Sequence, residues 1–315
     1  MEWPVDIQRE RIALYILALD AINFCFWFPI ESDTEKIPTT YEYDKLATTL
    51  TGMAQADHDA QRQDLTKISS DYALSAAALQ DMTTASMTSL FQHHCKNGNK
   101  SSSTPPNMEQ RCRLWNEIGR VLTQEYDGSA WKFICHVAKT QRANEEGRIV
   151  TVSAPSLVQH LIDSFEGFRD YYQVTPSSNG TPRTLYFLKR AQICVGDWKA
   201  ALARLDCLQV DDLDQLTMFA DYRVPQLLRH VGIMEYAGAL QQKIDKKEEF
   251  EAGSNEELDI RAATVVAVEW MVEELAQSGV SWTAVETDWY LWQVGERLQH
   301  QGALLPHHRV RTIYY

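Results

Sequence analysis

The chain has 315 residues, of which 44% are hydrophobic and 23% are charged, a composition typical of a globular protein that buries a sizeable core. Its 43 acidic and 30 basic residues give a formal net charge of −13. A surface of this sign repels polyanions, which argues against a protein that binds DNA or RNA over a large area. A small anionic ligand stays compatible with it, because a pocket can be locally positive inside an acidic protein.

The six cysteines form no CxxC pair, and several lie in apolar helical stretches, where cysteine behaves as a small hydrophobic residue. His93, His94 and Cys95 are adjacent rather than spaced like metal ligands. No signal peptide is visible. We therefore expect a cytoplasmic protein with reduced thiols, without disulfides and without a bound metal.

The first helical signal runs from Arg9 to Phe28, where apolar residues recur with the period of a helix. The overlapping run from Ile12 to Ile30 is apolar enough for a membrane span to be considered. It contains Asp20 and Asn23, however, and such residues are costly inside a bilayer. A buried helix is the better interpretation, and we expect no membrane partner.

The stretch from Leu185 to Leu202 has the apolar spacing of one buried helix face. No comparable set of alternating strands is evident, although one or two short strands are compatible with the middle of the chain. The sequence therefore predicts a mainly α-helical fold.

Two helix starts can be recognised near the C-terminus. Ser254 and Glu257 form a capping-box pattern that opens a long helix, which Gly279 is suited to end. Thr283 and Glu286 form a second capping box, which opens the last long helix.

Polar, turn-rich stretches indicate loops at 96–107, 176–183 and 246–257. None of them divides the core convincingly. We expect a single helical domain over residues 1–315, with a surface insertion at about 96–107 and an acidic linker at about 246–257. The length also permits two lobes.

Four regions depart from the pattern of a plain apolar core. They are LDAINFCFW at 19–27, YFLKRAQICVGDW at 186–198, LTMFADYRVPQLLRH at 216–230, and the C-terminal strings DWYLW at 288–292 and PHHRVRTIYY at 306–315. Together they resemble the queuosine 5′-phosphate N-glycosylase/hydrolase family, also called the queuosine salvage protein family, from near residue 10 to the last residue. The string FADYRVPQ, with KRAQ upstream and IYY at the end, is the most specific part of the match.

The resemblance implies a helical fold similar to the helix-hairpin-helix DNA glycosylases. It implies hydrolysis of the N-glycosidic bond of queuosine 5′-phosphate, which releases queuine and ribose 5-phosphate, and a role in the salvage of queuine for tRNA. The implied partners are this small nucleotide and queuine, with no large nucleic acid bound directly. No metal or organic cofactor is implied.

Cleavage of a nucleoside bond passes through an oxocarbenium-like ribose cation, which needs a nearby negative charge, a water and stabilisation of the departing base. A 7-deazaguanine lacks the purine N7 that is usually protonated. The protein must therefore stabilise charge elsewhere on the base or rely more strongly on stabilisation of the ribosyl cation.

Asp221 is the candidate catalytic carboxylate, which stabilises that cation and activates water. It lies between apolar Phe219 and aromatic Tyr222, and Pro225 disfavours helix at the residue before it, so Asp221 should lie at a turn or helix end. The structural alternative is an aspartate that caps a helix. With the family resemblance, the catalytic interpretation is preferred.

Asp288 is the candidate for reading the base, because a carboxylate can accept hydrogen bonds from the guanine-like N1–H and amine. It lies on or beside the apolar face of the last long helix. The structural alternative is a carboxylate that favours the N-terminal end of the helix dipole. The two aspartates could also exchange roles.

The remaining candidates are substrate-binding residues. Phe219 and Trp289 each lie next to a candidate aspartate and would stack on the base, as could Tyr222 and Trp27. Asn23 lies on the apolar run of the first helix and would contact the ligand or make a structural hydrogen bond.

Positive groups are needed for the 5′-phosphate. Lys189 is preferred and Arg223 is a further candidate, although a salt bridge to one of the many acidic residues is the alternative for either.

Two other classes remain open. A lesion-directed DNA glycosylase would need a basic DNA-binding face, which a charge of −13 disfavours. A non-catalytic carrier of queuine or a nucleotide is not excluded by composition. The grouping of aspartates with aromatic residues favours a small-molecule pocket over a flat interface.

Overall fold

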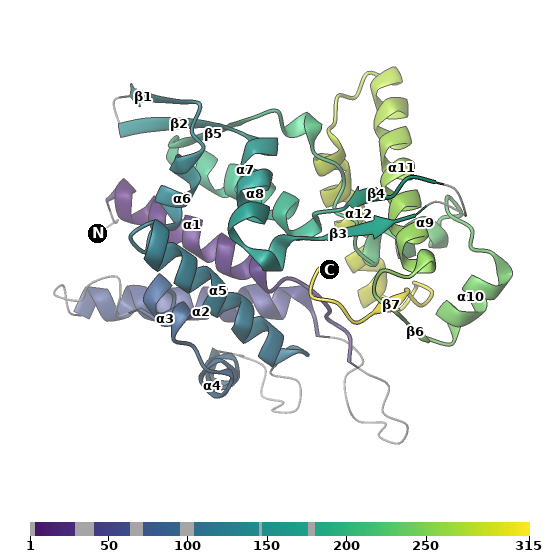
Figure 1. The fold of residues 1–315 in the computed structure, drawn as a ribbon, viewed down its shortest axis with the longest axis horizontal. Helices are drawn as coiled ribbons and strands as arrows, with labels where there is room; N and C mark the ends of the chain where they lie inside the picture. The colour runs from purple at the N-terminus through teal and green to yellow at the C-terminus, as the bar shows by residue number, and fades with distance from the viewer. Residues whose placement is uncertain (1–3, 29–40, 64–71, 95–103, 145–146, 176–179) are drawn as a thin grey trace. The chain divides into compact units, whose positions relative to one another are not determined.

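A computed structural model describes residues 4–28, 41–63, 72–94, 104–144, 147–175 and 180–315 (Figure 1). Helices predominate, so the mainly α-helical fold is confirmed. The chain forms two compact units. The first unit comprises Met1–Gly167 and Asp197–Val210, and the second comprises Phe168–Gly196 and Asp211–Tyr315.

Helix α1 (Val5–Ala21) is central to the first unit. Its residues from Ala13 onward are mostly buried, as expected for a helix that is apolar on all sides. Trp115 and Trp198 each donate an indole N–H to a carbonyl of this helix, at 2.8 and 3.0 Å. Helices α2 (Tyr43–Gln63), α5 (Met108–Glu125) and α6 (Ala130–His136) pack against it. Helix α3 (Ala76–Gln80) packs against α5, and α4 (Thr84–His94) packs against α2 and α5.

A small antiparallel hairpin and one further strand complete the first unit. The sheet has the order β1-β2-β5, built from β1 (Thr140–Asn144), β2 (Gly147–Ser153) and β5 (Leu208–Asp211). Helix α7 (Ala154–Ser164) follows β2 directly, and the short helix η3 (Glu166–Phe168) ends this part of the chain.

The second unit is built around three helices, α9 (Arg223–His230), α11 (Asn255–Gln277) and α12 (Ala284–His300), which pack against one another (Figure 1). Its hydrophobic core includes Phe187, Met218, Val224, Leu228, Leu258 and Val268. The smaller helices are η5 (Leu213–Gln215) and α10 (Gly238–Asp245).

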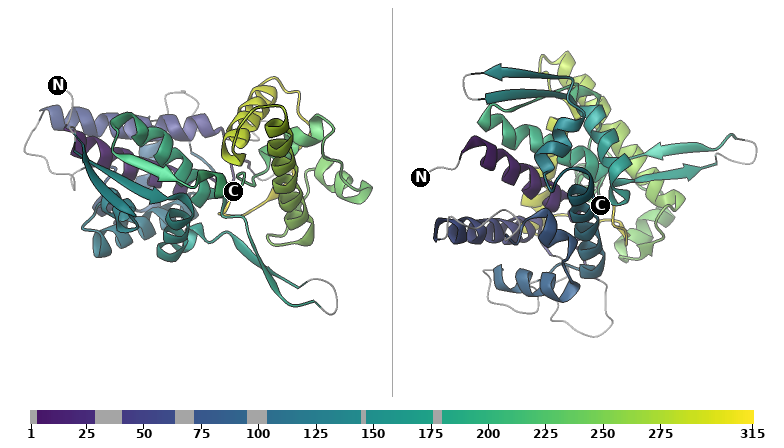
Figure 2. Two further views of the ribbon diagram at one scale, coloured as in Figure 1. Left: turned by 90° about the horizontal axis from the view of Figure 1, so that it is seen from above. Right: turned by 60° about the vertical axis from the view of Figure 1, so that its left-hand side comes forward.

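Two pairs of strands complete the second unit. Strands β3 (Tyr171–Val174) and β4 (Arg183–Tyr186) form an antiparallel hairpin (Figure 2), and its residues Tyr172, Val174 and Leu185 pack against this hydrophobic core. Strands β6 (Glu249–Phe250) and β7 (Arg309–Val310) pair in parallel. Helix α8 (Lys189–Leu202) begins in the second unit and ends, with η4 (Ala203–Leu205), in the first.

Seven strands occur among the described residues, which is more than the one or two expected. They have two to seven residues each, too few for an alternating pattern to be visible in the sequence. The segment expected to be an acidic linker at 246–257 contains β6 and the start of α11. Of the expected insertion at 96–107, residues 96–103 lie outside the described residues, and Asn107 is the N-cap of α5.

The expected helix ends differ in two places. The first helix stops at Ala21 instead of continuing to Phe28, and α8 starts at Lys189 instead of Leu185. Leu185 pairs with Tyr172 in the β3–β4 hairpin, and Leu188 has a φ of +50°, which breaks a right-handed helix.

The predicted caps near the C-terminus form largely as expected. Thr283 and Glu286 make a complete capping box. Ser254 caps α11 by accepting from the Glu257 N–H, but the Glu257 carboxylate accepts from the N–H of Gly253 rather than completing a box. Gly279 follows the C-cap of α11 with a φ of +82°.

Candidate functional site

Asp221 lies in the irregular segment that leads into α9, as its position before Pro225 suggested. Its Oδ1 accepts hydrogen bonds from the N–H groups of Arg223 at 2.8 Å and Val224 at 3.1 Å. The carboxylate therefore satisfies the start of the helix, as in the structural alternative. Its Oδ2 accepts no hydrogen bond from the described part of the chain, so the capping contact leaves one oxygen of a rigidly held carboxylate available.

Asp288 lies in the second turn of α12 with its side chain buried. Its Oδ1 accepts a hydrogen bond from the backbone N–H of Phe219 at 3.1 Å. Burial and the negative charge of Asp221 raise the pKa of the Asp288 carboxyl well above its usual range, although the Phe219 N–H and Lys189 oppose the shift. Two carboxyl groups thus share one region of the second unit in different environments.

Lys189 is the first residue of α8 and is buried. Its backbone N–H donates to Oδ2 of Asp170 at 3.1 Å. Its ammonium group lies near enough to Asp288 to lower the pKa of that carboxyl, against the larger effect of burial. The structure therefore brings Asp221, Asp288 and Lys189 together in one charged cluster.

Phe219 and Trp289 lie against the same glycine. A Cβ at Gly196 of α8 would meet Cζ2 of Trp289 at 3.1 Å and Cζ of Phe219 at 3.7 Å. Phe219 is buried, and Trp289 is half-buried. The absence of a side chain at Gly196 lets both rings approach this face of α8.

Tyr222 and Arg223 face a different set of partners. The Tyr222 ring stacks on His307 at a centroid separation of 4.4 Å. The Arg223 guanidinium pairs with Glu296 at 2.5 Å and also donates to Gln226 and to Gln299. Arg223 is thus engaged within the protein, and the phosphate contact suggested for it stays a prediction.

Asn23 and Trp27 belong to the first unit, in the segment that follows α1. Asn23 donates to Oδ1 of Asp20 at 3.4 Å, and both Asn23 and Trp27 are buried. Their contacts with a ligand stay predictions.

Arg111 of α5 explains why this segment leaves the helix. Its guanidinium donates to the carbonyl oxygens of Ile22, Phe24 and Cys25, the last two at 2.5 and 3.1 Å. The carbonyls are therefore satisfied without continuing α1, and Cys25 adopts a φ of +42°. Sequence reasoning had not identified Arg111.

Sequence reasoning also missed an ion pair between Asp170 and Arg261 in the second unit. The guanidinium of Arg261 makes two hydrogen bonds to the Asp170 carboxylate, at 2.9 and 2.7 Å, and the Arg261 side chain is completely buried. An arginine on the buried face of α11, beside Ile260 and Thr264, was the available signal.

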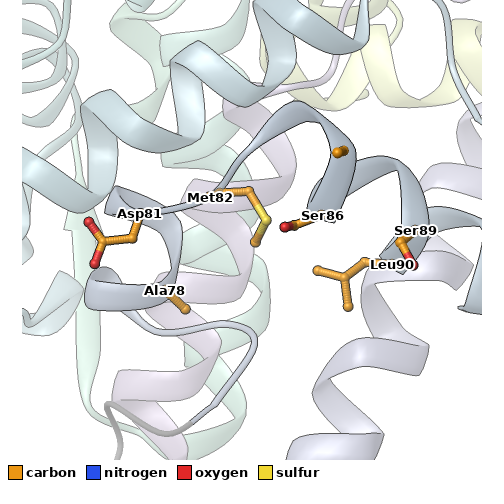
Figure 3. A pocket seen from close by; sticks show the side chains of 7 residues that line it. Ala78, Asp81, Met82, Ser86, Ser89 and Leu90 are labelled. Atoms are coloured by element: carbon orange, nitrogen blue, oxygen red, sulfur yellow. The ribbon is translucent and has the colours of Figure 1, made fainter.

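The first unit contains a separate cavity of about 640 Å³ at the connection between α3 and α4 (Figure 3). It is lined by Ala78, Asp81, Met82, Ala85, Ser86, Ser89 and Leu90. None of the residues predicted from the sequence lines it.

The described residues contain neither a cluster of metal-binding side chains nor a membrane-spanning helix. Among these residues, no group of three or more histidine, cysteine or acidic side chains is placed to hold a metal ion. No helix within the described ranges has the length and hydropathy that crossing a bilayer requires. The cysteines in these ranges are free thiols.

Comparison with known proteins gives a consistent result. Residues 4–315 match the model of a family described as queuosine salvage protein. The chain is 35% identical over 308 residues to the queuosine 5′-phosphate N-glycosylase/hydrolase of Sphaerobacter thermophilus, covering 98% of this chain and 82% of that protein. Proteins of the same name from Dictyostelium discoideum and Mus musculus are 34% and 28% identical, over 99% and 96% of this chain and 82% and 81% of theirs.

Proposed function

This chain belongs to the queuosine salvage protein family, and from that premise we propose that it hydrolyses the N-glycosidic bond of queuosine 5′-phosphate. The products are queuine and ribose 5-phosphate, and queuine becomes available for incorporation into tRNA. The observation that carries the proposal, beside the family match, is the cluster of Asp221, Asp288 and Lys189 in the second unit.

Hydrolysis breaks the bond between C1′ of the ribose and the base nitrogen. A water oxygen bonds to C1′, one water proton is lost from it, and the departing base gains a proton. Asp221 stabilises the positive charge that develops on the ribose and takes the proton from the water. Support comes from its geometry, since one carboxylate oxygen is fixed by two backbone N–H groups and the other is available for this role.

Asp288 reads the guanine-like edge of the base. Its Oδ1 is held by the Phe219 N–H, so the second oxygen has a defined direction. Hydrogen bonds from the N1–H and amine of the base would favour the ionised carboxylate, which burial disfavours in the free protein. An exchange of roles between Asp221 and Asp288 is the alternative assignment.

The remaining roles complete the site. Lys189 contacts the 5′-phosphate, because this buried lysine, which acts on Asp288, supplies a positive group of the kind that an anionic substrate needs. Phe219 and Trp289 stack on the flat base, with Tyr222 and Arg223 as further substrate contacts, and the ligand contacts of Asn23 and Trp27 stay predictions. We also propose that the fold is similar to that of the helix-hairpin-helix DNA glycosylases, and that the protein acts in the cytoplasm without a cofactor. In line with its acidic charge, we propose that it does not bind large nucleic acids directly.

The test is to incubate the purified protein with queuosine 5′-phosphate and to follow both products by mass spectrometry. Equal amounts of queuine and ribose 5-phosphate would support hydrolysis. Tight binding of queuine without release of either product would instead indicate a carrier.

A further inference from the structure

We infer that the buried ion pair between Asp170 and Arg261 is a positioning device, which fixes Lys189 and Asp221 in the geometry that hydrolysis requires. This inference rests on the proposed function. Neither Asp170 nor Arg261 belongs to the set of substrate-contacting residues proposed above. Both act through other residues.

Asp170 holds the start of α8. Its carboxylate Oδ2 accepts the N–H of Lys189 at 3.1 Å, and its backbone carbonyl accepts the N–H groups of Phe187 and Leu188, each at 3.0 Å. Three consecutive N–H groups therefore converge on one residue. The direction in which Lys189 leaves the backbone depends on Asp170.

Leu188 shows that this arrangement is constrained. It has a φ of +50°, a strained region of backbone conformation that a bulky residue rarely occupies. Such a conformation persists only where the surrounding contacts enforce it, and the bonds to Asp170 supply that enforcement. It occurs directly before Lys189.

Arg261 holds the segment that carries Asp221. Its Nε donates to the carbonyl oxygen of Ala220 at 3.0 Å, while its two terminal nitrogens donate to Asp170. On the other side of Ala220, the N–H of Phe219 is held by Asp288. The backbone immediately before Asp221 is thus fixed from two directions.

The same guanidinium and carboxylate therefore connect the two ends of the charged cluster. A displacement of Arg261 would therefore shift the backbone at Ala220 and, through Asp170, the backbone at Lys189. The hydrogen bonds that link Ala220, Arg261 and Asp170 are shielded from solvent, because all three residues are buried.

The surroundings of Arg261 keep it in place. The guanidinium carbon of Arg261 lies 4.0 Å from the ring centroid of Phe187 and 4.2 Å from the ring centroid of Tyr315. Burial is the largest influence on the pKa of Arg261 and lowers it, but the charge and hydrogen bonds of Asp170, together with Tyr315 and Glu257, raise the pKa above its usual value. The IYY string at the end of the chain thus contributes Tyr315, which covers the cation.

A buried ion pair is often replaceable by hydrophobic residues without loss of stability, so stability alone does not explain it. Its hydrogen bonds to the Ala220 carbonyl and the Lys189 N–H explain its presence. Apolar side chains could fill the same space, but they could not hold either backbone group. A positioning role of the ion pair and a purely structural role therefore predict different effects of substitution.

The test uses Arg261→Lys, which keeps the charge but cannot hold Asp170 and Ala220 at the same time. Release of queuine from queuosine 5′-phosphate is measured to give kcat and KM. We expect kcat to fall about 100-fold, the scale of a misplacement of about 1 Å. If Arg261→Lys does not fold, the isosteric Asp170→Asn is measured in the same way, with the same expected loss.

The matched control is Phe133→Leu, which perturbs a completely buried residue of the first unit. It should lower the melting temperature without a comparable loss of kcat. The fall in kcat is compared between variants whose melting temperatures are lowered equally. If Arg261→Lys then lowers kcat no more than Phe133→Leu does, Arg261 is a structural residue and the inference fails.

A double-mutant cycle gives the second readout. If Arg261 acts through Asp221, adding Arg261→Lys to Asp221→Asn should lower kcat little further, because the group being positioned is already disabled. Independent, multiplicative losses would overturn the inference while leaving the hydrolase intact. If the wild-type protein itself releases no queuine, the proposed function fails, and a positioning role for that reaction fails with it.

Discussion

The backbone N–H of Phe219 donates to Oδ1 of Asp288 across 3.1 Å, joining two residues that lie 69 positions apart in the sequence. This hydrogen bond connects the segment that carries Asp221 to the helix that carries Asp288. Each aspartate therefore has one oxygen engaged by the backbone, Asp221 at the start of α9 and Asp288 at Phe219. The arrangement gives the two carboxyl groups fixed positions, and burial beside Asp221 raises the pKa of the Asp288 carboxyl.

The raised pKa of Asp288 predicts a pH dependence of stability. The folded protein holds a proton on Asp288 at pH values where the unfolded chain has lost it, so this group's contribution to stability falls as pH rises from about 4, its unfolded value, to the raised folded pKa. Asp288→Asn cannot ionise and removes this slope. The melting temperature of the variant relative to wild type should therefore increase between pH 4 and pH 8.

A constant difference in melting temperature across that range would contradict the prediction. The same variant should raise KM for queuosine 5′-phosphate, because an amide cannot accept both base N–H groups as a carboxylate does.

The close approach at Gly196 predicts that even one methyl group there disturbs the aromatic rings. In Gly196→Ala, the new Cβ would lie 3.1 Å from Trp289 Cζ2, so Trp289 must shift. Affinity for queuine should fall by about tenfold, equivalent to about 1.4 kcal/mol. Isothermal titration calorimetry measures it.

Gly238→Ala is the matched control, because Gly238 is also helical but a Cβ there would meet nothing within 4 Å. Unchanged affinity is expected for it. Equal affinities for the two variants would show that Trp289 is not part of the queuine site.

The contacts of Arg111 predict a large stability effect in the first unit. Arg111→Lys keeps the positive charge but cannot reach the carbonyls of Ile22, Phe24 and Cys25 together. Each buried carbonyl left without a donor costs about 1–3 kcal/mol, so urea denaturation should show a loss of at least that size.

Arg120→Lys on the same helix is the control. Arg120 is exposed and donates to Gln124, and its replacement should change the free energy of unfolding by less than about 0.5 kcal/mol. Similar losses in the two variants would mean that the segment after α1 is not held by Arg111.

The helical character of the fold and its C-terminal caps were predictable because their signals are local. The Thr283 capping box needs two residues three positions apart, and the sequence displays both. The end of α1 was not predictable in the same way. Apolar spacing continues past Ala21, and what stops the helix is Arg111, which lies 89 residues from Ile22.

The candidate site shows the same division. The motifs drew attention to Asp221, Asp288 and Lys189, which lie near one another in the second unit. They gave no sign of the pair between Asp170 and Arg261, because the two residues are 91 positions apart and neither belongs to a recognisable pattern. Asp170 and Arg261 become partners only because the complete fold buries them beside each other.

The most direct test of the account compares queuine release by the wild-type protein and by Asp221→Asn. Asparagine also caps helices well, so α9 should keep its start while the negative charge is lost. Wild type should release queuine, and the variant should release it at least about 100-fold more slowly, with unchanged affinity for queuine. Release at the wild-type rate by Asp221→Asn would contradict the role of Asp221 and direct attention to Asp288, and tight queuine binding without release by either protein would contradict the hydrolase itself.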